Sequence, residues 1–288
     1  MPHAAPQRLA ALLGDPVHHS LSPRIHNHWF ARYRIPGIYL ALRVAERDLA
    51  AALALLPRLG FLGFNVTMPH KQRALELVDR LDAVARRVGA VNTVLVMEDG
   101  ALLGRNTDGE GFLASLKTAR PAWRADAAPV VLLGAGGAAR AIACALLDAG
   151  VPELRLVNRS RARAEALAAD LADSRIRITS WRERSKALSG AGLLVNATSL
   201  GMHGCAELEL DLDALPRAAV VADIVYAPRC TALLRRAQAR GHPVVEGLGM
   251  LLYQAVPGFA HWGGVVPEVD ERLWSLVAGG GDSGGNRG

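Results

Sequence analysis

Short apolar runs alternate with helix-periodic segments along most of the chain. The apolar runs predict strands at Leu9–Gly14, Ile38–Val44, Phe61–Val66, Val91–Met97, Pro129–Gly134, Glu153–Asn158, Gly192–Asn196, Ala219–Ile224 and Pro243–Glu246. The periodic segments predict helices at Pro23–Tyr33, Glu46–Leu56, Pro69–Leu81, Gly109–Leu116, Gly136–Ala149, Ala162–Ala172, Thr231–Arg240 and Leu248–Trp262. This alternation is typical of α/β proteins, in which helices cover the faces of a mainly parallel sheet.

A polar break at Lys117–Ala128, which contains Pro121, separates two such blocks. The apolar helix expected at Gly247–Trp262 is predicted to return to the first block, which makes the first domain discontinuous. We therefore expect one domain from residues 1–110 and 248–278 and a second from residues 111–247. The glycine-rich segment 279–288 is expected to be a disordered tail.

Composition suits a globular protein with two domains, because the chain has 288 residues of which 51% are hydrophobic and 21% charged. No apolar run reaches the roughly 18 residues that a membrane span needs. The segment Met1–Leu9 lacks the pattern of a secretory signal. The cysteines, Cys144, Cys205 and Cys230, are odd in number and widely spaced, which favours a reducing, cytoplasmic compartment.

The formal charge of +6 raises the question of nucleic-acid binding. The basic residues are spread along the chain rather than gathered in a stripe, and an anionic substrate and cofactor would equally favour a positive field. Only three of the 33 basic residues are lysines, namely Lys71, Lys117 and Lys186. A lysine can lose its proton near neutral pH and an arginine cannot, so a lysine here is a candidate for proton transfer.

The segment Pro129–Arg140 reads PVVLLGAGGAAR and contains the pattern G-x-G-x-x-A at Gly134, Gly136 and Ala139. An expected strand precedes it, an apolar helix follows it, and the next strand begins about twenty residues later, as in dinucleotide-binding folds. Gly136 would permit the close approach of a pyrophosphate, and the helix N-terminus would offer it N–H groups. The alternative is a plain glycine turn in an αβ unit.

The next strand ends in Asn158-Arg159-Ser160, without the acidic residue that NAD enzymes use to bind the ribose 2′-hydroxyl. Arg159, Arg161 and Arg163 instead stand at a helix start, where cations oppose the helix dipole. A 2′-phosphate among them would reverse that penalty, so NADP is the predicted cofactor. The alternative is that exposed arginines tolerate this position because salt screens them.

The segment Gly14–Asn27 places Ser20 and Ser22 at the start of an expected helix, with Pro23 at its first position. Two hydroxyls and free backbone N–H groups suit a carboxylate. Ordinary N-capping by Ser22 explains that serine equally well but leaves Ser20 unexplained.

In GFNVTMPHK, a helix that begins at Pro69 would place Lys71 in its first turn, where the helix dipole is expected to lower the pKa of the ammonium. Lys71 is therefore our candidate for proton transfer, and a solvated surface lysine is the alternative.

Asn92 at a strand start and Asp108 after a strand end would lie on the rim where open α/β sheets bind ligands. Thr107 and Glu110 also match a capping box, which would give Asp108 a purely structural role.

Eight motifs occur in the order seen in shikimate dehydrogenases, from about residue 9 to about residue 275: HSLSP, NVTMPHK, GAVNT, GRNTDGEG, GAGGAAR, VNRS, NATSLGM and GLGMLLYQA. The chain thus resembles that family. The resemblance implies reversible NADPH-dependent reduction of 3-dehydroshikimate to shikimate, a step in aromatic amino acid biosynthesis. It also implies an N-terminal αβ substrate domain and a Rossmann-like NADP domain.

Residue roles follow from the resemblance motif by motif. The catalytic pair would be Lys71 and Asp108. Substrate contacts would come from Ser20 and Ser22 to the carboxylate, from Thr67, Asn92 and Gln254 to ring hydroxyls, and from Tyr226 near the nicotinamide; Asn65 shares the loop of Thr67. The cofactor-binding residues would be Gly134, Gly136, Gly137, Ala138, Asn158, Arg159, Ser160, Arg163, Thr198, Gly247 and Met250. No metal is implied. Two positions depart from the family pattern, since Ser160 replaces the common threonine and Glu246 the usual aspartate.

Three alternatives remain at this point. The nearest is a quinate/shikimate dehydrogenase paralogue that uses NAD or NADP. A second is a non-catalytic sensor of a metabolite or cofactor, against which Lys71 and Asp108 both argue. A third is a basic nucleic-acid-binding protein, which the lack of a basic stripe with interleaved aromatic residues disfavours. The expected partner is a small molecule rather than nucleic acid or a membrane, and the chain is expected to be a monomer or a homodimer.

Overall fold

The computed structural model describes residues 7–278, which form two compact units. Unit 1 contains the chain up to Thr107 and again from Gln254, and unit 2 is Asp108–Tyr253. The tail predicted at 279–288 lies outside the described residues. Within the described part of the chain, no helix is both long enough and apolar enough to cross a membrane.

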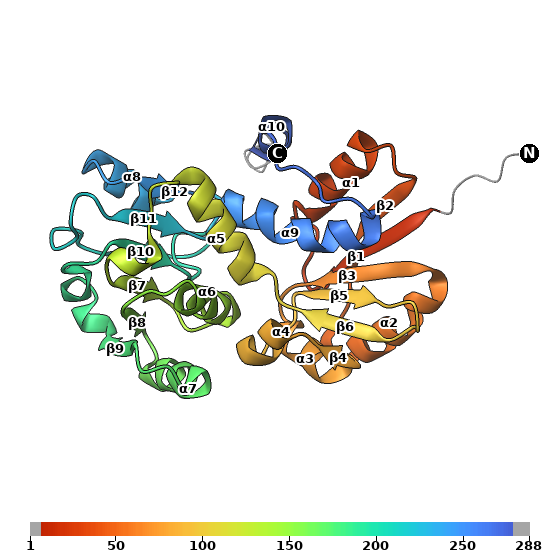
Figure 1. The fold of residues 1–288 in the computed structure, drawn as a ribbon, viewed down its shortest axis with the longest axis horizontal. Helices are drawn as coiled ribbons and strands as arrows, with labels where there is room; N and C mark the ends of the chain where they lie inside the picture. The colour runs from red at the N-terminus through yellow and green to blue at the C-terminus, as the bar shows by residue number, and fades with distance from the viewer. Residues whose placement is uncertain (1–6, 279–288) are drawn as a thin grey trace, which may run out of the picture. The chain divides into compact units, whose positions relative to one another are not determined.

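Unit 1 is built on a six-stranded sheet with the order β2-β1-β3-β5-β6-β4. The strands are β1 (Arg8–Gly14), β2 (Gly37–Arg43), β3 (Phe61–Val66), β4 (Arg80–Leu81), β5 (Thr93–Val96) and β6 (Leu102–Arg105). The pairs β1–β2, β1–β3 and β4–β6 are parallel, whereas β5 is antiparallel to both β3 and β6. The carboxyl ends of β1, β3 and β6 and the amino end of β5 therefore meet at one edge of this sheet (Figure 1).

Helices that follow the strands of unit 1 are short. They are α1 (Ser22–Arg32), α2 (Leu49–Leu55), α3 (Lys71–Leu77) and α4 (Ala83–Val88), with 3₁₀ turns at Glu46–Asp48 and Pro57–Leu59. Leu49 and Leu53 of α2 and Ala74 of α3 pack with the apolar residues of the sheet in one core cluster. Burial of these side chains holds the helices in place, because segments of this length are marginal in isolation.

The C-terminal segment returns to the first block of the chain. It consists of α9 (Gly247–Gly263) and α10 (Glu271–Ala278). Phe259 of α9 packs on Trp29 and Phe30 of α1, with ring centroids 5.2 and 5.0 Å apart. Arg24 of α1 donates to the carbonyl of Leu276, so α10 lies beside α1 (Figure 1).

Unit 2 contains a parallel six-stranded sheet with the order β12-β11-β10-β7-β8-β9. Its strands are β7 (Val130–Leu133), β8 (Leu154–Asn158), β9 (Ile176–Ser180), β10 (Leu193–Asn196), β11 (Val220–Asp223) and β12 (Val244–Val245). Its helices are α5 (Asp108–Ala119), α6 (Gly137–Asp148), α7 (Arg161–Leu171) and α8 (Ala232–Ala239), with 3₁₀ turns at Ala125–Ala127, Trp181–Glu183 and Lys186–Leu188. Numbered within the unit, the order is 3-2-1-4-5-6 about a switch point between β7 and β10, the topology of dinucleotide-binding folds. The predicted α/β class with a Rossmann-like domain is confirmed.

Several short or half-exposed elements were not predicted from the sequence. They are β4, β6, β9, α4 and α10. Strand β9 lies at a sheet edge and alternates apolar and polar residues, so it lacks the continuous apolar run of its buried neighbours. The helix predicted at Pro69–Leu81 was too long, because it ends at Leu77. The chain then extends so that the Asp79 amide donates to Leu102 O at 3.0 Å and β4 pairs with β6.

Candidate functional site

In unit 1, the loops after β1 and β3 are bound to each other at the carboxyl edge of the sheet. The Thr67 amide donates to Leu13 O at 2.9 Å, and the Asp15 amide donates to Met68 O at 3.1 Å. A Cβ on Gly14 would lie 2.4 Å from Thr67 Cγ2, so only glycine permits this approach. The loop that carries Ser20 is thereby fixed against the loop that carries Thr67.

At the start of α1 it is Ser20, and not Ser22 as predicted, whose hydroxyl accepts a backbone amide. The N-cap of α1 is Leu21, without a side-chain hydrogen bond, and Ser22 is already the first helical residue. The Ser20 hydroxyl instead accepts the Ser22 amide at 3.2 Å. The prediction of Ser22 as the N-cap was therefore wrong, because the helix begins one residue earlier than expected. The hydroxyl that accepts an amide at the helix start belongs to Ser20.

Lys71 is the first residue of α3, which follows the loop after β3. Its carbonyl accepts the Val91 amide at 2.8 Å, and the Val66 amide donates to Asn92 O, also at 2.8 Å. These two bonds attach the segment before β5 to the loop of Lys71. Lys71 is partly exposed.

A buried amide and hydroxyl network continues from Asn92. Its Oδ1 accepts the Thr107 amide at 2.9 Å, and the Thr107 hydroxyl donates to Gln254 O at 2.8 Å. The Thr107 amide is therefore not bonded to the Glu110 side chain, as the predicted capping box requires, because it donates to Asn92 instead. Thr107 instead joins Asn92 to Gln254, two residues predicted to bind ring hydroxyls.

Thr93 and Tyr39 complete this network and were not predicted from the sequence. The Tyr39 hydroxyl donates to Asn65 Oδ1 at 2.7 Å, and Asn65 Nδ2 donates to Thr93 Oγ1 at 3.1 Å. Thr93 in turn donates to Asn92 Oδ1 at 3.0 Å. Burial raises the pKa of Tyr39 well above its usual value, so its hydroxyl remains a donor at physiological pH. A sequence contains no local signal for such bonds, since the partners lie up to 28 residues apart.

Asp108 follows Thr107 directly and is the first residue of α5, in unit 2. Its side chain is 5% exposed. An acidic residue in the first helical turn interacts favourably with the helix dipole.

In unit 2, the loops after β7 and β10 approach each other at the topological switch point. Gly134 has φ +113°, and a Cβ there would lie 2.7 Å from Ala197 O and 3.3 Å from Thr198 Cγ2. Glycine is therefore required by the neighbouring loop as well as by the backbone conformation. Gly136 and Gly137 differ, since a Cβ on either would meet no atom within 4 Å.

A buried carboxylate ties the loops after β10 and β11 together. Asp223 is 2% exposed and accepts from Asn196 Nδ2 at 3.0 Å, from the Val225 amide at 3.0 Å and from the Thr231 hydroxyl at 2.8 Å. Burial raises the pKa of the Asp223 carboxyl, and these three hydrogen bonds act in the opposite direction. Asn196 Oδ1 accepts from the Thr198 hydroxyl at 2.7 Å. Asp223 was not predicted as a site residue, because its partner Asn196 lies on another strand, 27 residues earlier in the sequence.

Tyr226 and Gly247 lie at the same edge of this sheet. Tyr226 comes directly after the loop that Asp223 holds, and burial raises the pKa of its hydroxyl. A Cβ on Gly247 would lie 2.4 Å from the carbonyl of Ile224, so the start of α9 packs against the backbone that leads to Tyr226. Met250 is buried one turn further along α9.

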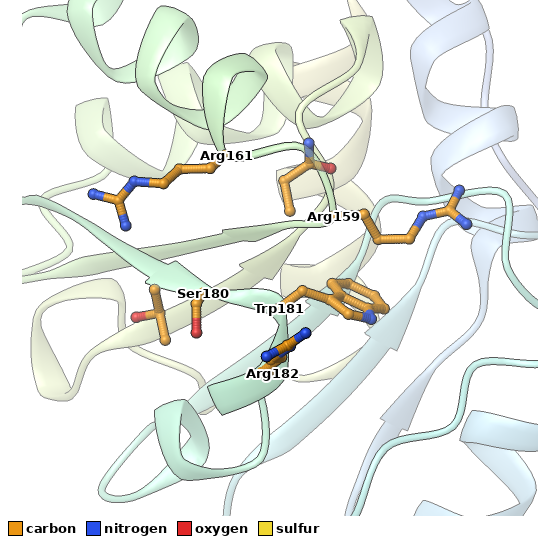
Figure 2. A pocket seen from close by; sticks show the side chains of 7 residues that line it. Arg159, Arg161, Ser180, Trp181 and Arg182 are labelled. Atoms are coloured by element: carbon orange, nitrogen blue, oxygen red, sulfur yellow. The ribbon is translucent and has the colours of Figure 1, made fainter.

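A cavity of about 430 Å³ opens beyond the carboxyl ends of β8 and β9 (Figure 2). Its lining residues are Asn158, Arg159, Arg161, Thr179, Ser180, Trp181 and Arg182. The predicted residues Asn158 and Arg159 are among them. Ser160 and Arg163 are not among them; the Ser160 hydroxyl caps α7 by accepting the Arg163 amide at 3.4 Å. The lining segment from Thr179 to Arg182 was missed because strand β9 itself was not predicted.

These features fit a phosphorylated dinucleotide. Gly136 is the N-cap residue of α6, a 12-residue helix, and it makes no side-chain cap bond, so the first amide groups of the helix are open to a diphosphate. The cavity beyond β8 carries arginines where NAD enzymes carry a carboxylate. Among the described residues, no group of three or more His, Cys, Asp or Glu side chains is arranged to hold a metal ion.

Two family profiles match the chain. One, described as the shikimate dehydrogenase substrate binding domain, matches residues 12–94, and the other, described as shikimate / quinate 5-dehydrogenase, matches residues 117–224. The NADP(+) shikimate dehydrogenase of Paramagnetospirillum magneticum is 54% identical over 94% of this chain and 98% of its own length. The enzyme of Rhodospirillum rubrum with the same name is also 54% identical, over 94% and 97%.

Solved structures agree with these relatives. Shikimate 5-dehydrogenase of Thermus thermophilus in complex with NADP(H) and shikimate has a TM-score of 0.84 at 37% identity, covering 95% of this chain and 99% of that one. Quinate dehydrogenase of Corynebacterium glutamicum in complex with NAD has a TM-score of 0.87 at 31% identity, covering 94% and 99%.

Proposed function

The chain belongs to the shikimate dehydrogenase family, and we propose that it catalyses the reversible reduction of 3-dehydroshikimate to shikimate with NADPH, a step in aromatic amino acid biosynthesis. The observation that carries this proposal is the 54% identity, over nearly the full length of both chains, to a dehydrogenase named for shikimate and NADP(+). Identity at this level across both units supports the same substrate and cofactor, and not only the same fold.

Substrate recognition is assigned to polar groups at the carboxyl edge of the unit 1 sheet. Ser20 and Ser22 would bind the carboxylate, and Thr67, Asn92 and Gln254 would bind the ring hydroxyls. The network through Thr107 supports this assignment, because it fixes Asn92 and the backbone of Gln254 before substrate arrives. A site built to hydrogen-bond hydroxyls rejects analogues that lack them, by leaving its own buried polar groups unpaired.

Proton transfer is assigned to Lys71 and Asp108. NADPH, when bound, supplies the hydride that reduces the ring carbonyl. The Lys71 ammonium polarises the carbonyl oxygen and donates a proton to it as its negative charge develops. Asp108 is assigned as the second member of the catalytic pair. In the direction of oxidation, the same pair takes the proton from the substrate hydroxyl.

The cofactor is assigned to unit 2. The residues Gly134, Gly136, Gly137 and Ala138 would receive the diphosphate, and Asn158, Arg159, Ser160 and Arg163 the phosphorylated ribose. Thr198 would contact the cofactor, Tyr226 would lie near substrate and nicotinamide, and Gly247 and Met250 would flank the nicotinamide. The hydrogen bonds that Asp223 makes to two loops support this last group, because they fix the backbone on which Thr198 and Tyr226 stand.

An absorbance assay at about 340 nm, the absorption band of reduced nicotinamides, tests the proposal. Purified protein is mixed with shikimate or quinate, each with NADP⁺ or NAD⁺. Rapid reduction with shikimate and NADP⁺, and much slower reduction in the other three mixtures, is expected. Faster turnover of quinate, or with NAD⁺, would move the chain to the quinate-oxidising branch. No turnover by folded protein in any mixture would overturn the proposal.

We further propose that the enzyme is cytoplasmic and is a monomer or a homodimer. Light scattering of the purified protein measures the mass directly. A mass of one or two chains is expected, and a larger assembly would contradict it.

A further inference from the structure

The turn after β9 brings an arginine to the cavity beyond β8 that the glycine and arginine motifs of the sequence do not include. Arg182 lines this cavity together with Arg159, and none of the seven lining residues is acidic. Arg161 extends away from Arg159 (Figure 2) and is paired with Glu165 at 2.8 Å. Among the described residues, neither Arg159 nor Arg182 has a hydrogen-bond or ion-pair partner. Two guanidinium groups without a partner at one cavity give it a positive potential, which favours an anionic ligand there.

Trp181, next to Arg182, is held in a defined position. Trp181 packs against the apolar core of unit 2 and also lines the cavity. The Arg184 guanidinium carbon lies 5.0 Å from the ring centroid, and Arg184 Nη1 donates to Trp181 O at 2.9 Å. Arg184 is itself anchored by a bond from its Nε to Glu209 O at 3.0 Å. The cavity therefore has an indole surface whose position does not depend on a ligand.

We infer that the Trp181–Arg182 turn is a second determinant of selectivity for 2′-phosphorylated dinucleotides. Arg182 binds the 2′-phosphate together with Arg159, and the indole of Trp181 presents an aromatic surface to the adenine. The inference rests on the proposed function, because it names further residues for the same cofactor. Cavity size, charge and an aromatic wall all match an adenosine that carries a phosphate on its ribose.

The two residues should act differently on the two halves of the ligand. Arg182 interacts with charge, so it should distinguish ligands with and without the 2′-phosphate, and salt should weaken its effect because the side chain is exposed. Trp181 interacts with the base, which both ligands share, so its effect should be equal for both and insensitive to salt.

Direct binding of fragments tests the inference without substrate. Titration calorimetry measures the affinity of the full-length protein for 2′,5′-ADP and for 5′-AMP. Arg182→Ala is expected to weaken 2′,5′-ADP roughly tenfold, the scale of one charge-assisted hydrogen bond, and to leave 5′-AMP within about twofold. Arg159→Ala should show the same selective loss. Trp181→Leu, which keeps an apolar side chain against the core, should weaken both ligands by a similar factor.

Arg177→Ala is the matched control. Arg177 lies on β9, the strand that leads into the turn of Arg182, and is also exposed, but it bonds to the carbonyls of Ser174 and Ile176 and does not line the cavity. It removes the same charge and should leave the ratio of the two affinities unchanged. If Arg182→Ala behaves like Arg177→Ala, or weakens both ligands equally, the role of Arg182 is overturned. If Trp181→Leu leaves 5′-AMP binding intact while its thermal unfolding stays normal, the role of Trp181 is overturned.

The outcome is separable from that of the proposed function. Wild-type protein that oxidises shikimate with NADP⁺ while Arg182→Ala keeps its preference for 2′,5′-ADP would overturn the inference alone. Protein that fails to oxidise shikimate but loses that preference in Arg182→Ala would overturn the proposed substrate and leave the inference standing.

Discussion

At the scale of single residues, Lys71 differs from the other two lysines in the hydrogen bonds that its segment makes. Lys71 stands at the start of a seven-residue helix whose first carbonyl holds the segment that leads to Asn92. Of the other lysines, Lys117 is exposed in the last turn of α5, and Lys186 is exposed in a 3₁₀ turn. Of the three lysines, only Lys71 is hydrogen-bonded to the segment that leads into the polar network of unit 1.

Lys71→Ala is expected to reduce the turnover number by roughly 10²–10⁴-fold, since it removes the group that protonates the developing alkoxide. Shikimate binding should survive in part, because Ser20, Ser22 and Asn92 remain. Steady-state kinetics and equilibrium binding measure the two effects separately. Lys117→Ala serves as the control and should match wild type. Near-normal turnover in Lys71→Ala would exclude the lysine as the proton donor.

At the scale of elements, the glycine-rich turn after β7 contains two kinds of glycine. Gly134 is enclosed, with a left-handed backbone and the Ala197 carbonyl where a Cβ would stand. Gly136 has φ −86°, which any residue adopts, and faces no neighbouring atom. The first is therefore required by the fold, and the second is required only if something outside the protein approaches the backbone.

Substitution by alanine should separate these two requirements. Gly134→Ala is expected to lower the free energy of unfolding by roughly 1–3 kcal/mol, because a non-glycine residue is strained at this φ and must also displace the loop after β10. Gly136→Ala should leave stability nearly unchanged and weaken NADPH binding. Chemical denaturation and cofactor titration of both variants measure this. Equal stability loss in both would show that Gly136 also serves the fold.

At the scale of the whole molecule, a buried aromatic cluster in unit 1 joins parts of the chain that are distant in sequence. His26 of α1 stacks on Tyr39 at 4.1 Å and lies 6.0 Å from Phe259 and 5.4 Å from Trp262 of α9. Burial lowers the pKa of His26 from 6.5 to about 3, with Asn65 acting in the opposite direction. The imidazole is therefore neutral in the folded protein throughout the physiological range.

Acid should destabilise unit 1 through this histidine. Between pH 6.5 and about 3 the unfolded chain binds a proton at His26 that the folded chain does not, so stability is complete above 6.5 and falls with pH. Lowering the pH from 7 to 5 is expected to cost wild type roughly 2 kcal/mol more than His26→Phe, which keeps the ring and cannot be protonated. Urea unfolding at both pH values measures this difference. A difference that does not change with pH would refute the assignment.

The sequence by itself determined the α/β class, most of the buried strands and the positions of the functional motifs. These depend on local properties: runs of apolar residues, the periodicity of helices, and glycines and prolines at turns. For this reason the strands from β1 to β3 and from β7 to β8 were predicted to within about two residues, a usual error at element ends.

Only the tertiary structure decided which side chains bond to one another. The Ser20 hydroxyl accepts the amide at the helix start assigned to Ser22, the Thr107 amide bonds to Asn92 rather than to Glu110, and the turn after β9 supplies Arg182 to a cavity. In each case the contact that forms differs from the one that the local sequence pattern predicts. A hydrogen bond forms with whichever partner the packed backbone brings within about 3 Å, and that choice depends on the arrangement of the whole unit rather than on adjacent residues.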